Sequence, residues 1–167
     1  MKVDIALGSN LGDRLHYLAE AKSALLALPN VQKHCVSSRI YESKPVACPD
    51  GTHHFLNAAM RIHYLGGGLL ELLNGLQAIE QSLNRPPQRE NNACRTIDLD
   101  VICAENLVLN HQRLILPHPR AHHRAFVLCP LADIEPSLIL PGQAQTIAQL
   151  LDALPVNQCL ELAGAAW

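Results

Sequence analysis

The sequence carries two aspartates, Asp98 and Asp100, that are separated by a single apolar residue. If this stretch is a β-strand, alternate side chains share a face, so both carboxylates point one way while Ile97, Leu99 and Val101 point into a core. The two Cα atoms would then stand about 6.6 Å apart. Two carboxylates at this distance can hold one hard cation or bridge two, and magnesium prefers carboxylate, water and phosphate oxygens. The pattern predicts a magnesium site completed by substrate phosphate, with a solvated strand face as the alternative.

Arginines gather in the same part of the chain, which contains no lysine. Six of them lie between residues 85 and 124: Arg85, Arg89, Arg95, Arg113, Arg120 and Arg124. Guanidinium groups make forked hydrogen bonds to phosphate oxygens and stay charged at any relevant pH. Phosphoryl transfer depends mainly on positioning and on charge stabilisation, so two carboxylates among arginines suit that chemistry. Surface arginines that pair with Glu90 and Glu105 are the alternative interpretation.

Two further polar groupings could contact a nucleotide or a flat ring. Gln77, Glu80 and Asn84 have the spacing of a stripe along one helix face, which either contacts solvent or faces a nucleotide. Phe55 and Asn57 share a face if they lie on a strand. A ring that can stack beside an amide that both donates and accepts suits a flat heteroaromatic ligand, although a core Phe and a hydrogen-bonded Asn would give the same pattern.

Residues 8–13, which read GSNLGD, join a short apolar run to a helical pattern. They contain neither the lysine of a phosphate-binding loop nor a GxGxxG motif. We therefore interpret Ser9, Asn10 and Asp13 as turn and capping groups.

The histidines of the chain form no motif that binds zinc. None belongs to an HExxH sequence, and neighbouring histidines such as His122 and His123 point apart on one element. His118 stands between Pro117 and Pro119, so we expect it to be a rigidly placed hydrogen-bond donor.

Hydrophobic periodicity and turn residues predict the elements that position these groups. Strands are expected at 3–7, 36–41, 55–64 and 96–103, long helices at 13–28 and 69–83, and shorter helices near 121–128 and 146–154. The order of the first six elements is that of a ferredoxin-like βαββαβ sandwich, an α+β fold with an antiparallel sheet, here with additional C-terminal helices. No repeat or linker appears, so residues 1–167 are expected to form a single domain.

Composition narrows the class of protein. The chain is 49% hydrophobic but only 4% aromatic, and its net charge is −2. A nucleic-acid partner would need a basic face, and a single-strand RNA platform would need exposed rings, so neither is expected. The six cysteines form no CxxC pair, no signal peptide is apparent, and no apolar run approaches the length of a membrane span. We expect a soluble cytoplasmic protein without a membrane partner.

Five stretches together carry a family resemblance: ALGSNLGD, YESKPV, FLNAAM, RTIDLDVI and LPHPRAHHRAFVLCPLADIEP. Taken in order, they resemble the 6-hydroxymethyl-7,8-dihydropterin pyrophosphokinases of folate biosynthesis, and RTIDLD combined with LPHPR is specific. The resemblance implies a ferredoxin-like fold and an enzyme, expected to be a monomer, that transfers diphosphate from ATP to 6-hydroxymethyl-7,8-dihydropterin and releases AMP.

The resemblance also implies roles for individual residues. Asp98 and Asp100 would hold two magnesium ions on the phosphates of ATP. Arg85 and Arg95 would be the catalytic arginines of a loop that closes over those phosphates. Five residues would line the nucleotide site: Gln77, Glu80, Arg113, His118 and Arg124. Six would contact the pterin, with Phe55 and Phe126 on its two faces and Ser43, Lys44, Val46 and Asn57 along its edge.

The sequence departs from the family pattern in one loop. Family members usually carry a Trp-Gly-Pro-Arg run before the aspartate strand, whereas residues 92–94 before Arg95 read Asn-Ala-Cys. Pro87 also stands where a second loop arginine often occurs, and Arg89 is a candidate replacement. Two alternatives therefore stay open: a diverged paralogue that acts on another pterin-like alcohol, and a pterin- or nucleotide-binding module without turnover.

Overall fold

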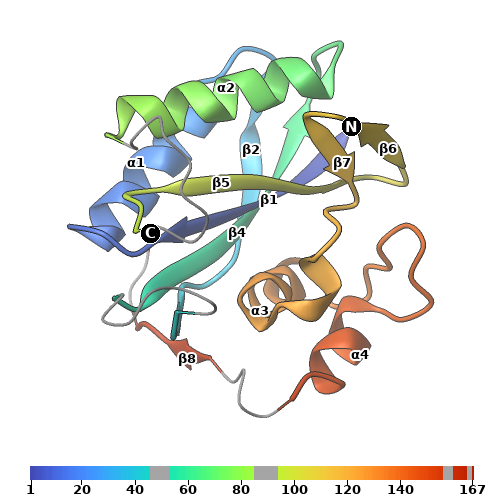
Figure 1. The fold of residues 1–167 in the computed structure, drawn as a ribbon. Helices are drawn as coiled ribbons and strands as arrows, with labels where there is room; N and C mark the ends of the chain where they lie inside the picture. Colours follow the sequence, from blue (N-terminus) through green and yellow to red (C-terminus); the bar gives the residue numbers. More distant parts are fainter. Residues whose placement is uncertain (46–52, 85–93, 156–159, 165–166) are drawn as a thin grey trace.

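An antiparallel β-sheet with helices on both faces forms the body of the molecule (Figure 1). The computed structural model describes residues 1–45, 53–84, 94–155, 160–164 and 167. Its main sheet contains β1 (Lys2–Ser9), β2 (Val31–Ser37), β3 (Tyr41–Ser43), β4 (Phe55–Tyr64), β5 (Asp98–Ala104) and β8 (Glu161–Leu162). The strand order is β5-β1-β4-β3-β8, and β2 also pairs with β4. Strand β4 therefore pairs with three strands and lies at the centre of the sheet.

The helices divide between the two faces of the sheet. One face is covered by α1 (Arg14–Leu26) and α2 (Leu69–Ser82), and the other by α3 (Ala125–Ile134) and α4 (Ile147–Asp152) with a 3-10 turn (Ala121–His123). The first face holds the larger core, in which alternate residues of β4 such as Met60 and Ile62 are fully buried. A smaller core joins α3 and α4 to Ala59 and Ile102 on the second face. Because successive side chains of a strand point to opposite faces, alternate residues of each strand belong to the larger core and to the α3 face.

Most predicted elements are present with small changes at their ends. The strand expected at 55–64 has those bounds, and Asp13 caps α1 by accepting a hydrogen bond from the backbone N–H of His16 at 3.1 Å. Thr146 caps α4 through a capping box with Gln149. The helix expected to end at Leu128 runs to Ile134 through Pro130, because the residues around that proline bury their side chains against the sheet.

The prediction of a single strand at 36–41 is wrong, because this part of the chain is divided between β2, which ends at Ser37, and β3, which begins at Tyr41. The Ser38 hydroxyl accepts the N–H of Ala59 at 2.8 Å and donates to the carbonyl of Arg39 at 2.6 Å. A side chain thus takes part in pairing with β4 where the strand is interrupted. The alternation fails as well, since Val36 is 44% exposed whereas Ile40 and Tyr41 are both buried.

Two short pairings had no counterpart among the predicted elements. The hairpin of β6 (Leu109–His111) and β7 (Leu114–Leu116) forms a separate two-stranded sheet, and β8 extends the main sheet by pairing with β3. None of the helices in the described part of the chain has the length and hydropathy of a membrane span.

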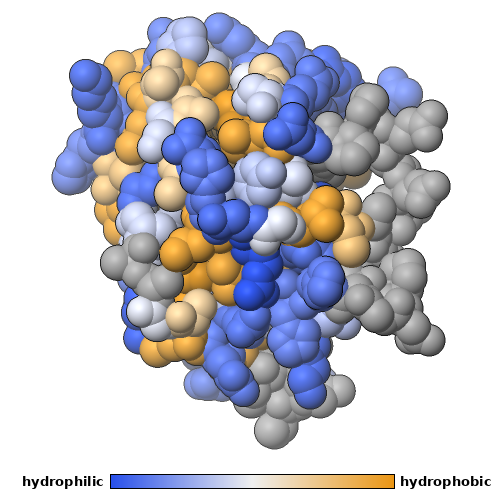
Figure 2. All heavy atoms as spheres, turned by 90° about the vertical axis from the view of Figure 1, so that its left-hand side faces the viewer, coloured by the Kyte–Doolittle hydropathy of each residue, from blue (hydrophilic) through white to orange (hydrophobic). Residues whose placement is uncertain are grey.

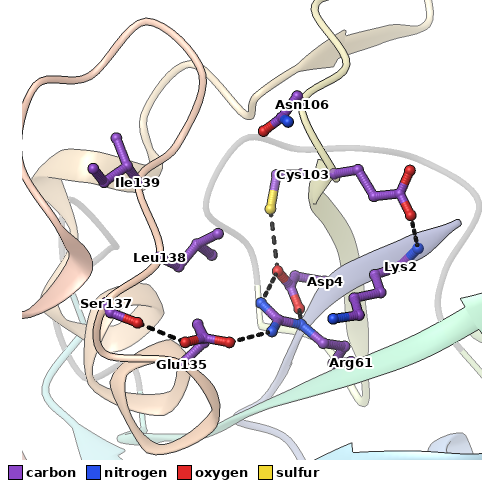
Figure 3. A pocket seen from close by; sticks show the side chains of 10 residues that line it. Lys2, Asp4, Arg61, Cys103, Asn106, Glu135, Ser137, Leu138 and Ile139 are labelled. Carbon is purple, nitrogen blue, oxygen red and sulfur yellow. Dashed lines mark hydrogen bonds and ion pairs between the residues drawn. The ribbon is translucent and has the colours of Figure 1, made fainter.

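A buried ion pair lies on the α3 face of the sheet (Figure 3). Arg61 of β4 donates from Nε to Asp4 Oδ1 at 2.7 Å and from Nη2 to Asp4 Oδ2 at 2.8 Å. It also donates to Glu135, which follows α3, at 3.2 Å. These side chains line a hollow of about 400 Å³ that also borders Ser137 and Ile139. The network joins the sheet to the segment after α3.

Candidate functional site

One row of paired residues crosses four strands on the α3 face of the sheet. Asp98 of β5 pairs with Gly8 of β1, Gly8 pairs with Asn57 of β4, and Asn57 pairs with Tyr41 of β3. Directly paired residues of antiparallel strands direct their side chains to the same face. A carboxylate, a position without a side chain and an amide therefore follow one another across the sheet.

This row lies at the side of the molecule where β1 ends and where β4 and β5 begin. Figure 2 looks onto that side, on which hydrophilic side chains lie beside hydrophobic ones in the middle of the view. The ion pair of Arg61 and Asp4 lies on the same strands, four residues along from the row. At the usual rise per residue of a strand, this is a distance of about 13 Å. The row and the ion pair are thus separate polar regions of the α3 face, and the row includes the residues singled out from the sequence.

Asp98 and Asp100 lie on one face of β5, as the sequence predicts. Leu99 and Val101 between and after them are 4% and 3% exposed, so they belong to the opposite core. Arg95 Nη1 donates to Asp98 Oδ2 at 2.7 Å, and the two side chains are 20% and 25% exposed. The carboxylate pair is therefore partly open to solvent and has one arginine directly bound.

A second arginine, Arg124, interacts electrostatically with the two aspartates. Burial lowers the pKa of the Arg124 guanidinium, the charge of Arg120 lowers it further, and the charges of Asp100 and Asp98 oppose this change. The interactions that shift this pKa place Arg124 within electrostatic reach of both carboxylates. The predicted cluster of arginines and aspartates is therefore brought together for Arg95 and Arg124, and Arg120 lies near Arg124.

His118 lies beside this cluster in its neutral form. Burial, followed by the charges of Arg124 and Arg120, lowers its pKa to about 4. Its Nδ1 accepts the backbone N–H of Arg120 at 3.2 Å, so the proton of the neutral ring is on Nε2. The His118 backbone N–H donates to Ile102 of β5 at 2.8 Å. The histidine is thus attached to the aspartate strand and has one N–H left to donate.

The amide of Asn57 is the centre of the second half of the row. Its Nδ2 donates to the Ser43 hydroxyl at 2.9 Å and to the Tyr41 carbonyl at 3.3 Å, and the residue is 4% exposed. A Cβ on Gly8 would stand 3.8 Å from Asn57 Oδ1 and 3.9 Å from Phe55 Cδ1. The missing side chain leaves space between an aromatic ring and an amide oxygen.

Phe126 and Arg124 come from the start of α3. The guanidinium carbon of Arg124 lies 5.3 Å from the centroid of the Phe126 ring. Phe55 and Phe126 are both half-buried, on β4 and α3 respectively. A residue predicted to contact the nucleotide and one predicted to contact the pterin thus touch each other in the folded protein.

The helix stripe predicted along α2 is not continuous. Glu80 is 5% exposed, and its carboxylate accepts the backbone N–H of Leu99 at 2.8 Å, whereas Asn84 is exposed beyond the end of the helix. The interpretation of a uniformly solvated face is therefore wrong at Glu80, because this carboxylate binds the aspartate strand. Arg113 donates to Gln77 at 3.3 Å, which joins two of the residues that are predicted to line the nucleotide site.

Three predicted pterin and phosphate residues lie at or beyond the edge of what is described. Lys44 is exposed just after β3, while Val46 and Arg85 lie outside the described residues. Sequence reasoning missed Gly8, whose importance depends on its pairing with Asp98 and Asn57. It also gave Asn10 only a turn role, although Asn10 binds the backbone of Arg95. Neither pairing has a local signal in the sequence.

The donor set of the aspartate strand fits magnesium. Over the residues that the structure describes, no group of three or more His, Cys, Asp and Glu side chains could enclose a metal ion. The expectation that His122 and His123 point apart is wrong, because the 3-10 turn brings their ring centroids to 3.8 Å. Asp98 and Asp100 provide carboxylate oxygen alone, so other ligands would come from water and phosphate. Magnesium commonly binds with one or two carboxylates and substrate phosphates.

Comparisons with known proteins agree on one family. The family model for 7,8-dihydro-6-hydroxymethylpterin-pyrophosphokinase (HPPK) matches residues 4–136. The chain is 35% identical over 158 residues to the 2-amino-4-hydroxy-6-hydroxymethyldihydropteridine pyrophosphokinase of Haemophilus influenzae, which covers 95% of this chain and 96% of the relative. It is 42% identical over 130 residues to the enzyme of the same name from Bacillus subtilis, covering 78% and 75%.

Solved structures show a similar fold. The wild-type HPPK-DHPS of Plasmodium falciparum with pteroate aligns over 90% of this chain with a TM-score of 0.69 and 14% identity. This chain spans 42% of that protein, less than half of its length. At such low identity the likeness concerns the fold alone.

Proposed function

The chain belongs to the 7,8-dihydro-6-hydroxymethylpterin-pyrophosphokinase family, and from this premise we propose that the row from Asp98 to Tyr41 is the floor of its active site. The enzyme transfers a diphosphate group from ATP to 6-hydroxymethyl-7,8-dihydropterin in folate synthesis. The observation that carries the proposal is the order of groups on one sheet face: two carboxylates, the gap at Gly8, and the Asn57 amide. Phosphate chemistry at one end and ring recognition at the other match the two substrates.

Asp98 and Asp100 would hold magnesium at the phosphate end of the floor, and we propose two ions. Magnesium held by these carboxylates would screen the phosphate charges and stabilise the leaving oxygen. The fit rests on two carboxylates that share a partly exposed face. Glu80 would help to fix their positions, because its carboxylate accepts the backbone N–H of Leu99, the residue between them.

The cations around the aspartates would bind the phosphates of ATP. Arg95 and Arg124 lie within reach of the carboxylates, and the Nε2–H of His118 remains as a donor. Arg85, which lies outside the described residues, keeps its predicted catalytic role as a proposal. Gln77 and Arg113 contact each other and would line the nucleotide site. The nucleotide role of Glu80 is likewise kept as a proposal.

The pterin would lie over Gly8 with its edge toward Asn57. Phe55 and Phe126 supply rings from β4 and α3, while Ser43 fixes the amide so that Oδ1 can accept from the ligand. Lys44 follows Ser43, and Val46 lies outside the described residues, so both stay proposals. The flat ligand thus would occupy space that a side chain at position 8 would fill.

In the proposed reaction, the hydroxymethyl oxygen of the pterin attacks the β-phosphorus of ATP. A new bond forms between this oxygen and the phosphorus, the bond from the β-phosphorus to the oxygen shared with the α-phosphate breaks, and AMP leaves. The hydroxyl proton is released to solvent. Arg95 and Arg124 offset the negative charge that develops on the transferred group, which is the main contribution a protein makes to phosphoryl transfer.

The arrangement of the sheet supports the finer prediction of a ferredoxin-like fold. The four longest strands have the order β5-β1-β4-β2, and α1 and α2 lie on one face, as expected for a βαββαβ unit. Helices α3 and α4 are the additional C-terminal helices of the prediction. A single domain over residues 1–167, a monomeric state and a cytoplasmic location stay predictions.

An AMP-release assay tests the proposed function directly. Purified protein with Mg²⁺, ATP and 6-hydroxymethyl-7,8-dihydropterin is expected to form AMP and the pterin diphosphate. The assignment fails if no AMP forms while Asp98→Ala binds ATP as tightly as the wild-type protein. Release of AMP only with another pterin alcohol would indicate a diverged paralogue, and tight binding by calorimetry without product would indicate a binding module.

Substitution of Gly8 by valine tests the position of the pterin. A Cβ at this position makes ordinary van der Waals contacts, and valine suits a strand, so the melting temperature is expected to change little. The added methyl groups fill the gap beside Asn57, so the KM for the pterin should rise at least about tenfold while the KM for ATP stays the same. Gly67→Val, at an exposed position with open space, is the matched control. An unchanged pterin KM would place the ring elsewhere.

A further inference from the structure

Asn10 makes two hydrogen bonds to the backbone of Arg95. Its own N–H donates to the Arg95 carbonyl at 3.1 Å, and its side-chain Oδ1 accepts the Arg95 N–H at 2.7 Å. The residue is 1% exposed, so water does not compete for these bonds. A residue predicted to serve a turn thus binds a segment 85 positions away in the sequence.

The two bonds occur where the β1–β5 ladder ends. Its last pair is Gly8 with Asp98, and β5 begins at Asp98. Arg95 lies outside this ladder, three residues before the aspartate that its guanidinium binds. Asn10 therefore continues the attachment of the two segments beyond regular strand pairing, with an amide side chain in place of a backbone carbonyl.

Both ends of Arg95 are consequently fixed to known points. The backbone N–H of Arg95 donates to Asn10 Oδ1 at 2.7 Å. The guanidinium donates to Asp98 Oδ2 at the same distance, 2.7 Å. The reach of an arginine side chain is limited, so the positions that its head group can take depend on the place of its Cα. A small error in the position of a group that binds the reacting phosphates can reduce the rate about 10²-fold.

We propose that Asn10 is a positioning residue for Arg95, which holds the guanidinium at the distance from Asp98 that the bound phosphates require. The proposal rests on the proposed function, because it concerns the phosphate end of the same site. Asn10 acts through Arg95 and does not itself contact the substrates. Its effect on the reaction therefore disappears when the Arg95 side chain is absent.

A double-mutant cycle measures this dependence. Asn10→Ala is expected to lower kcat about 10- to 100-fold in the wild-type background and less than about twofold in an Arg95→Ala background. The same cycle is measured on the Kd of a non-hydrolysable ATP analogue with Mg²⁺, by calorimetry. Equal losses in both backgrounds, in either quantity, would overturn the proposal, because a general structural role costs the same with or without the arginine side chain.

Matched variants separate positioning from stability. Asp13→Ala removes the cap of α1 in the same loop without touching Arg95, so it should lower the melting temperature and leave kcat and the analogue Kd unchanged. If Asn10→Ala does not fold, the cycle is run with Asn10→Ser, whose side chain is too short to reach the Arg95 N–H.

The two hypotheses fail in different ways. If the wild-type protein forms no AMP, the proposed function fails, and the binding cycle still decides whether Asn10 acts through Arg95. If the wild-type protein is active and the two substitutions have additive effects, only the positioning role of Asn10 is overturned.

Discussion

Asp98→Asn is expected to lower kcat at least about 10³-fold while the protein stays folded. Asparagine has the shape of aspartate, and the position is a quarter exposed on the edge of the sheet, so the fold loses little. The carboxylate charge, however, is one of two that Asp98 and Asp100 offer to magnesium, and it is also the partner of Arg95. Loss of a preorganised charge at a phosphoryl-transfer site lowers the rate by a factor of this size.

The dependence of the rate on magnesium distinguishes a metal ligand from a residue that only binds Arg95. For Asp98→Asn and Asp100→Asn, the Mg²⁺ concentration that gives half the maximal rate should rise at least about tenfold. Asp152→Asn, at an exposed carboxylate in the last turn of α4, is the control and should behave as wild type. If the Asp98 variant retains both its rate and its magnesium dependence, the two aspartates are ordinary surface groups.

Arg61→Met is expected to lower the free energy of unfolding by about 3–5 kcal/mol. Asp4 is 3% exposed and receives two hydrogen bonds from Arg61, so removing the arginine leaves a buried carboxylate whose remaining partner is the Cys103 thiol at 3.2 Å. Burial, and then the charge of Asp4, raise the pKa of that thiol, which therefore stays protonated and does not add a second charge. Urea unfolding of the variant and the wild-type protein measures the difference.

The double variant Asp4→Leu with Arg61→Met is the matched comparison. A buried ion pair that is replaced by apolar side chains of similar volume usually costs little, so the double variant should recover most of the lost stability. The pair lies about 13 Å along the strands from the Asp98 row, so kcat well below the melting temperature should change less than about twofold. A loss below 1 kcal/mol in the single variant would show that water reaches Asp4 when Arg61 is removed.

The elements with a clear period were predictable from the sequence. Strand β4 and helix α2 repeat apolar residues with the spacing of their structure, and β5 was recognised because Leu99 and Val101 alternate with the aspartates. Periodicity is a local property, so it predicts the face of each side chain on its own element. That was enough to place Asp98 beside Asp100 and Phe55 beside Asn57.

The parts that could not be predicted depend on contacts between distant segments. The edge strand is interrupted because the Ser38 hydroxyl binds Ala59, and β8 is a strand of two residues that exists by pairing with β3. The meeting of Gly8 with Asn57 and Asp98 is a matter of register, which a single sequence does not contain. Glu80 was assigned to a polar stripe for the same reason, since the N–H of Leu99 that binds it comes from another element.

The pairing of β4 with three other strands has a consequence for how this gene can change. Loss of one codon within residues 55–59 would turn every later side chain of β4 over, so Arg61 would enter the α1–α2 core and Met60 would leave it. Loss of two codons would preserve the two sides but would shift Asn57 past Gly8. Insertions and deletions should therefore be excluded from this strand even where single substitutions are accepted.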